Sequence, residues 1–169
     1  MGRDKALVPF HGRPMAEVVS EALTGGGCHR VVAIGGDSAG LAAIGLEVVP
    51  DRSPGEGPLG AVVCALQAHI GASVVLVVGC DTPLLDAATV RTVLGSLAVH
   101  PTADAAFGRT DRVQPLLGAW RPRCLPLVAE AFEEGERSIH RAMARLEVVE
   151  VDVPPESVRN MNTPRDLNG

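Results

Sequence analysis

Short apolar runs and amphipathic segments alternate along the whole chain, and this alternation limits the folds that the sequence can adopt. The clearest run, SVVLVVG at 73–79, is apolar on both faces, as a central strand of a parallel sheet must be. Segments with apolar residues at helical spacing separate the runs. The sequence therefore predicts an α/β fold, with a mostly parallel sheet and helices on both faces. Strands are expected at 30–34, 46–49, 73–79, 103–108, 113–120 and 147–152, and helices at 13–27, 60–71, 86–100, 125–134 and 138–145.

Composition favours one soluble domain and argues against two classes of partner. The 169 residues suit a single domain, 1–169, and no repeat or linker interrupts them. The chain has 15 basic and 20 acidic residues, a formal charge of −5, and only 2% aromatic residues. Such a chain lacks the basic surface and stacking rings of a nucleic-acid binder and the basic patch that anionic membranes attract. No apolar stretch is long enough to span a bilayer, and no signal-peptide pattern is visible.

The four cysteines show neither a C-x-x-C pair nor the spacing of a metal site. We interpret them as reduced, small core residues in the cytoplasm, where disulfides are rare. The expected class is a soluble cytoplasmic α/β enzyme. The cysteines are Cys28, Cys64, Cys80 and Cys124.

Two acidic residues follow predicted strands, Asp51 after LEVVP and Asp81 after SVVLVVGC. Ligands of open α/β sheets bind beyond the carboxyl ends of the strands, so both carboxylates are expected at one edge of the sheet. A single acid at such a place is often only a helix N-cap, but two at the same edge, each before a Pro-containing loop, favour a functional site. Cys80 is interpreted as a buried neighbour and not a nucleophile, because no His lies nearby in the sequence to activate it.

A glycine-rich stretch, GEGPLG at 55–60, spells G-x-G-x-x-G before a predicted helix, and Asp81 follows it at roughly the spacing of a dinucleotide-binding fingerprint. The context is poor, because the preceding strand ends near Pro50 and the fingerprint needs a tight turn. Pro58 also lacks a backbone N–H for the pyrophosphate. An NAD-binding oxidoreductase is therefore kept as an alternative, whereas the lack of G-x-x-x-x-G-K-[ST] excludes a P-loop NTPase.

The segment MGRDKAL contains the one lysine of the chain, Lys5. It resembles the end of the signature loop L-A-G-G-x-S-x-R-M-G-x-D-K-A-L of nucleotidyltransferases of the molybdenum cofactor guanylyltransferase (MobA) type, and GRP at 12–14 resembles the G-x-P that follows. Further matches come in the family order and cover essentially the whole chain. They are Asp51 with GPLG at 57–60, CDTP at 80–83, QPL at 114–116 and NMNTPRDL at 160–167.

This resemblance implies a three-layer Rossmann-like nucleotidyltransferase fold. It also implies transfer of GMP from GTP to molybdopterin with release of pyrophosphate. Lys5 would steady the triphosphate and Asp81 would hold Mg²⁺, so these two are the expected catalytic residues. Contacts with other proteins of cofactor biosynthesis are compatible with this role.

The resemblance further implies binding residues on two sides of the site. Thr163 and Asp166 are instead interpreted as the start of a helix. For the nucleotide, the expected residues are Lys5, Asp51, Gly57, Pro58 and Asp81. For the pterin, they are Gln114, Arg137, Asn160 and Asn162.

The sequence departs from the family pattern at its beginning, where the first strand and the L-A-G-G half of the loop are missing. That strand lies in the middle of the family's sheet, and burial of its apolar side chains is worth about 10 kcal/mol, as much as a typical domain's whole stability. We therefore expect either a true start upstream of Met1 or a poorly stable, weakly active fragment. A related cytidylyl- or sugar-nucleotide transferase and a non-catalytic nucleotide-binding remnant remain alternatives.

Overall fold

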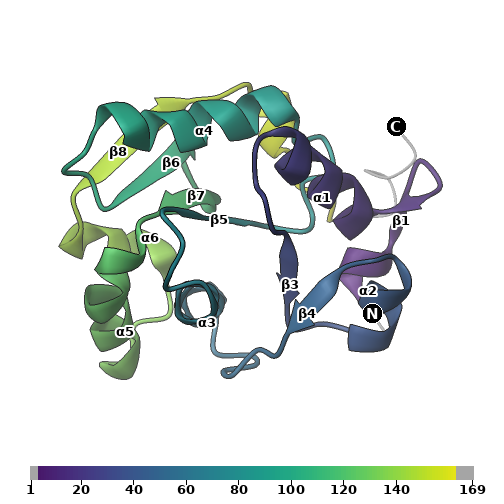
Figure 1. Ribbon diagram of the computed structural model, residues 1–169, viewed down its shortest axis with the longest axis horizontal. Coiled ribbons are helices and arrows are strands. Elements are labelled where there is room, and N and C mark those ends of the chain that lie inside the picture. Colours follow the sequence, from purple (N-terminus) through teal and green to yellow (C-terminus); the bar gives the residue numbers. More distant parts are fainter. Residues whose placement is uncertain (1–3, 163–169) are drawn as a thin grey trace.

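The computed structural model describes residues 4–162, which form three layers around a four-stranded sheet with the order β5-β7-β6-β8 (Figure 1). Helices α1 and α4 cover one face, and helices α3, α5 and α6 cover the other (Figure 1). The strands are β5 (Val75–Val78), β6 (Ala105–Arg109), β7 (Val113–Trp120) and β8 (Val148–Asp152). The helices are α1 (Met15–Gly25), α3 (Pro58–Ala68), α4 (Ala87–Val99), α5 (Leu125–Glu133) and α6 (Ile139–Ala142), with short 3₁₀ turns η3 (Met143–Arg145) and η4 (Pro155–Val158) near the end.

Alternation of side chains along the central strands β6 and β7 divides the core between the two helical layers. Phe107 and Trp120 point toward α3 and α5 and meet edge to face, with ring centroids 5.0 Å apart. Their sequence neighbours Ala106 and Ala119 point toward α1 and α4. Because all four residues are fully buried, both faces of the sheet are covered, as the apolar runs predict.

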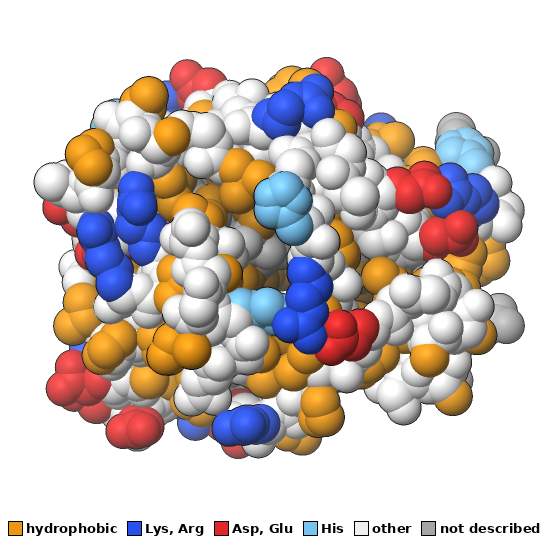
Figure 2. Space-filling view, in the orientation of Figure 1, with side chains coloured by type: hydrophobic (Ala, Val, Ile, Leu, Met, Phe, Trp, Pro, Cys, Tyr) orange, Lys and Arg blue, Asp and Glu red, His pale blue; other side chains and the backbone are white. Residues whose placement is uncertain are grey.

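A second, smaller sheet consists of β3 (Val32–Ile34) and β4 (Glu47–Val49), which are parallel and linked by α2 (Ser38–Ala43). Within residues 4–162, no ladder joins this pair to the larger sheet, and β5 pairs on one side only. Figure 2 shows a hollow with hydrophobic side chains on its wall between these two parts. The expectation that the family's first strand lies in the middle of the sheet stays a prediction.

The α/β architecture and the strands and helices predicted within residues 4–162 are present, with ends shifted by a few residues, but the strand pairing is more mixed than predicted. β5 is not a central parallel strand, because it pairs antiparallel with β7. β7 is also antiparallel to β6, whereas β6 and β8 are parallel. The reason is the three-residue connection between β6 and β7, which is too short for the crossover that parallel neighbours need.

Two local elements were missed by the sequence analysis. Helix α2 is short and rich in Ala and Gly, and Asp37 caps it by accepting a hydrogen bond from Gly40 N at 3.1 Å. A hairpin of β1 (Pro9–Phe10) and β2 (Arg13–Pro14) precedes α1. None of the helices in the described part of the chain has the length and apolarity that a bilayer crossing requires.

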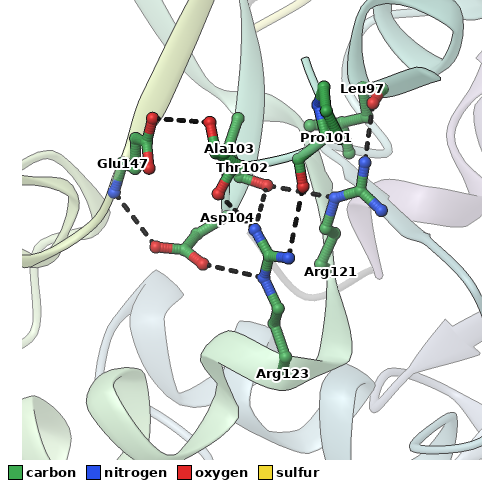
Figure 3. A network of polar contacts seen from close by, with 8 residues as sticks. All are labelled: Leu97, Pro101, Thr102, Ala103, Asp104, Arg121, Arg123 and Glu147. Carbon is green, nitrogen blue, oxygen red and sulfur yellow. Dashed lines mark hydrogen bonds and ion pairs between the residues drawn. The ribbon is translucent and has the colours of Figure 1, made fainter. Parts of the chain in front are cut away.

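Arginine side chains fasten the end of α4 to the region that follows β7 (Figure 3). Arg121 donates to the carbonyl oxygens of Leu97, at 2.6 Å, and Ala103, at 3.0 Å. Arg123, in the 3₁₀ turn η2 (Pro122–Cys124), donates to Asp104 at 3.1 Å. The last carbonyl groups of a helix have no partner within it, so the bond from Arg121 to Leu97 satisfies an acceptor of α4 that would otherwise need water.

We expect Arg121→Ala to lower the free energy of unfolding by about 1.5–3 kcal/mol, the usual range for hydrogen bonds to a charged group. Urea denaturation followed by circular dichroism measures the change. Arg112→Ala is the matched control, because this exposed arginine lies in the β6–β7 turn and makes no side-chain hydrogen bond among the described residues. Equal midpoints for the two variants would contradict the assigned role.

Candidate active site

The segment that carries Lys5 is a short turn, here called the lysine turn, made of Asp4 and the 3₁₀ helix η1 (Lys5–Leu7). The Asp4 carboxylate caps it, since Oδ1 accepts a hydrogen bond from Ala6 N at 3.0 Å. Ala6 is buried in a cluster with Ala16 of α1 and Leu41 of α2. The apolar residue of the turn thus anchors it to two helices, and Lys5 extends toward the end of β5.

Lys5 and Asp81 are brought together by the structure, as the sequence analysis expected. Lys5 Nζ donates to Asp81 Oδ2 at 2.7 Å, and the Asp81 side chain is only 17% exposed, against 36% for Lys5. A Cβ at Gly79 would lie 2.6 Å from Asp81 Oδ1, so the glycine at the end of the strand makes room for the carboxylate. Asp81 is not the N-cap of the next helix, because Asp86 caps α4.

The end of the described chain also contacts this ion pair. Asn162 Oδ1 accepts a hydrogen bond from Lys5 Nζ, and Met161 N donates to the Asp81 carbonyl oxygen at 2.7 Å. Met161 is 2% exposed and packs with Phe10. The asparagines on either side of Met161, Asn160 and Asn162, are both exposed. The expected helix start at 163–166 lies outside the described residues.

Asp51 lies on the other side of the lysine turn, at the wall of a pocket of about 460 Å³ that we call the Asp51 pocket. The pocket lies at the carboxyl ends of β3 and β4. Asp51 Oδ1 accepts a hydrogen bond from Ser53 N at 2.9 Å. A Cβ added at Gly35 would lie only 3.0 Å from the Cβ of Asp51, and the φ of +69° at this position also favours glycine. The lining residues are Ile34, Gly35, Gly36, Ser38, Val48, Pro50, Asp51, Pro54 and Gly55.

A second pocket, of about 250 Å³, contains Gln114 and is called the Gln114 pocket. Asn160 and Pro58 line it too, so the structure places Pro58 beside two of the residues expected to meet the pterin. Gln114 Nε2 donates to Thr110 Oγ1 at 2.9 Å, which fixes the direction of its amide. The lining residues are Pro58, Thr82, Gln114, Pro115, Leu116, Leu117, Ser138, Ile139, His140, Val158 and Asn160.

The loop that holds Gly57 separates the two pockets. Gly55 lines the Asp51 pocket, and Pro58, the first residue of α3, lines the Gln114 pocket. A Cβ at Gly57 would lie 3.2 Å from Arg137 Cβ, so Gly57 allows this loop to pack against the segment before α6. Arg137 also donates a hydrogen bond to Glu56 at 2.6 Å, so it contacts two consecutive residues of the loop.

Each residue of the Lys5–Asp81 pair has a sequence neighbour at one of the pockets. Gly36, in the Asp51 pocket, touches the lysine turn at Asp4. Thr82, in the Gln114 pocket, directly follows Asp81. Lys5 and Asp81 themselves line neither pocket, so both pockets adjoin the ion pair through these neighbouring residues.

Several pocket residues were not singled out by the sequence analysis. The available signal for the Asp51 pocket was the pair of glycines directly after a predicted strand, since such turns often need positive φ. Ser138, Ile139 and His140 gave no such signal, because only the tertiary fold brings α6 against β7. The missed glycines are Gly35 and Gly36, with φ of +69° and +87°.

Cys80 is partly buried, not fully buried as expected, and its surroundings do not activate it as a nucleophile. Burial raises the pKa of its thiol, and the nearby charges of Asp81 and Asp4 raise it further. A raised pKa leaves less thiolate, which is the nucleophilic form. The four cysteines form no disulfide.

Comparison with known proteins decides the family. Residues 1–150 match the MobA-like NTP transferase domain. The chain belongs to this family. The NAD alternative is therefore dropped, and the structure gives the reason: β4 ends at Val49 and α3 begins at Pro58, so no tight strand-to-helix turn surrounds the glycines at 55–60.

Relatives match nearly the full chain. The molybdenum cofactor guanylyltransferase of Rhodobacter capsulatus is 34% identical over 173 residues, covering 99% of this chain and 86% of the relative. Molybdopterin-guanine dinucleotide biosynthesis protein A of Archaeoglobus fulgidus has a similar structure, with a TM-score of 0.77 and 22% identity over 97% of this chain and 87% of that one. A Mycobacterium tuberculosis protein in complex with manganese gives a TM-score of 0.72 at 18% identity, over 99% and 94% of the two chains. The nucleotidyltransferase fold is thus confirmed.

At pH 8 we expect iodoacetamide to modify Cys80 at least about 10-fold more slowly in the native protein than in urea, because its thiol pKa is raised only in the fold. Cys124, whose pKa burial raises to about 12, should react more slowly still. Mass spectrometry of peptides from timed reactions measures both rates. Equal native and unfolded rates for Cys80 would show that the fold does not suppress its thiolate and would contradict this prediction.

Proposed function

We propose that this protein transfers GMP from GTP to molybdopterin and releases pyrophosphate, as a molybdenum cofactor guanylyltransferase. The observation that carries the proposal is the 2.7 Å contact between Lys5 Nζ and Asp81 Oδ2 at the end of β5, in a chain of the MobA-like family. Such transferases must neutralise two anionic substrates, and here a cation and a carboxylate lie side by side. Thr82 of the Gln114 pocket directly follows Asp81, and the turn that carries Lys5 lies against Gly36 of the Asp51 pocket.

Lys5 is the residue that would bind the triphosphate. A unit positive charge about 4 Å from a phosphate oxygen gains about 4 kcal/mol at an effective dielectric constant near 20. Its partially exposed ammonium is held by Asp81 and Asn162, which orient it before substrate enters. On binding, phosphate oxygens would take over part of these hydrogen bonds.

Asp81 is the residue that would hold Mg²⁺. Within residues 4–162, no three His, Cys, Asp or Glu side chains gather at a metal site. A single carboxylate such as that of Asp81 suits magnesium, which is commonly held by one or two carboxylates, with phosphate oxygens and water completing its shell. When bound, the ion would withdraw charge from the α-phosphate. The Asp81 carboxylate is largely shielded from bulk water and would lie beside the triphosphate held by Lys5.

The two pockets would hold the two substrates. The Asp51 pocket suits the base and ribose of the nucleotide, because it combines a carboxylate with the turn of Gly35 and Gly36. The Gln114 pocket suits the pterin, whose ring carries hydrogen-bond donors and acceptors that Gln114 and Asn160 can meet.

The bond changes would take place between the two pockets. A terminal phosphate oxygen of molybdopterin attacks the α-phosphorus, a new P–O bond forms, and the bond to the pyrophosphate oxygen breaks. Gly57 lies in the loop between residues of the two pockets, Pro58 begins α3 in the Gln114 pocket, and Asn162 bonds Lys5 beside Asp81. We also propose a cytoplasmic location, which the four free cysteines support.

Lys5→Ala and Asp81→Ala should each lower the rate of GTP- and molybdopterin-dependent pyrophosphate release by at least about 100-fold, the usual cost of removing one charge-stabilising group. Unchanged circular dichroism would show that the variants fold. The matched control is Arg30→Ala, which breaks an exposed ion pair with Glu47 at the start of the small sheet. Activity of either site variant equal to the parent's would refute the roles given to these residues.

Guanine selectivity is tested by comparing the four NTPs at equal concentration with magnesium and molybdopterin. We expect GTP to support the fastest pyrophosphate release and NADH to be ignored. Preference for CTP would favour the cytidylyltransferase alternative. Nucleotide binding without pyrophosphate release from any NTP would favour a non-catalytic remnant.

A further inference from the structure

The Asp4 carboxylate bridges two segments that are far apart in the sequence. Its Oδ1 accepts a hydrogen bond from Ala6 N at 3.0 Å, within the lysine turn. Its Oδ2 accepts one from Asp37 N at 2.6 Å, in the turn between β3 and α2. Hydrogen bonds to a charged acceptor are the stronger kind, so this single side chain ties the lysine turn to the small sheet.

The turn after β3 is shaped to receive this carboxylate. Gly36 has a φ of +87°, and a Cβ there would lie 2.6 Å from Asp4 Oδ2 and 3.1 Å from Leu41 Cδ1. Any side chain at this position would displace either the carboxylate or the buried leucine. Asp37 in turn caps α2, so the N–H that Asp4 accepts belongs to a fixed helix start.

The position of Lys5 depends on this attachment. The turn that carries it packs on α1 and α2 and bonds the turn after β3, whereas its ammonium contacts Asp81 at the end of β5, in the larger sheet. Because no ladder within residues 4–162 connects the two sheets, strand pairing does not set the distance across this gap. Asp4 supplies a polar contact between the lysine turn and the turn that follows β3.

We propose that Asp4 is a positioning residue for guanylyl transfer, acting through Lys5 by locking the lysine turn onto the Gly36–Asp37 turn. This inference rests on the function proposed above. Both carboxylate oxygens of Asp4 accept hydrogen bonds from backbone N–H groups, so its loss would misplace the ammonium while Lys5 itself stays present. A misplacement of about 1 Å can cost about 100-fold in rate.

Asp4→Ala should therefore lower kcat by about 100-fold and leave KM for molybdopterin unchanged. Asp4→Asn keeps one carbonyl oxygen as an acceptor and should lose about 10-fold. Steady-state pyrophosphate release gives both constants, and thermal denaturation shows that the variants fold. Full activity of Asp4→Ala would overturn the inference, and so would a loss in Asp4→Asn as large as in Asp4→Ala.

A glycine pair tests the same contact while Asp4 stays in place. Gly36→Ala pushes the carboxylate away and should reproduce the fall in kcat. Gly45→Ala is the matched control: Gly45 has a similar φ of +82°, follows the same helix α2, and has nothing within 4 Å of an added Cβ. Equal kinetics for the two glycine variants would show that backbone strain alone is responsible and would overturn the inference.

A double-mutant cycle separates positioning from a general structural role. If Asp4 acts through Lys5, adding Asp4→Ala to Lys5→Ala should not lower the residual rate further. A further loss of about 100-fold in that background would show an independent role and contradict the inference. Retained activity of Lys5→Ala alone would instead refute the proposed function and this inference with it, whereas retained activity of Asp4→Ala alone refutes only the inference.

Discussion

The ion pair between Lys5 and Asp81 connects two parts of the molecule that are otherwise joined by packing and loops. On one side lies the small sheet with α2, which carries the lysine turn, and on the other lies β5, which ends at Asp81. In the absence of ligand the two charges satisfy each other, and the larger part of the Asp81 side chain is shielded from water. The site is therefore electrostatically balanced before an anionic substrate arrives.

Two pockets of different composition adjoin this pair through neighbouring residues. The Asp51 pocket is built from strand ends and glycine turns, whose backbone can approach a ligand closely. The Gln114 pocket is built from α6, β7 and the segment before Asn162, and it offers side-chain amides and a His. A loop rich in Gly and Pro runs between them. This arrangement suits a reaction in which two different substrates must meet at one phosphorus atom.

Much of the fold was predictable because apolar runs and helical spacing report burial directly, as at β5 and α4. The pairing of β5 with β7 was not, because strand order depends on tertiary contacts and on the short turn before β7. At the site, position after a strand predicted the place of Asp81. The sequence could not show that Pro58 lines the Gln114 pocket, since that follows from how α3 packs. Asp4 belongs to the matched segment MGRDKAL, but the sequence could not show its contact, because its partner Asp37 is distant in the sequence.

The lysine content of the chain allows a direct test of the central claim. Lys5 is the one lysine, and its side chain is 36% exposed, so an amine-acylating reagent modifies it without interference from other lysines. The measurement is the rate of Lys5 acylation, followed by mass spectrometry, with and without saturating GTP and magnesium. We expect GTP to slow acylation at least about 10-fold, because its phosphate oxygens would accept hydrogen bonds from Lys5 Nζ and shield it from the reagent. An unchanged rate with GTP bound would contradict it.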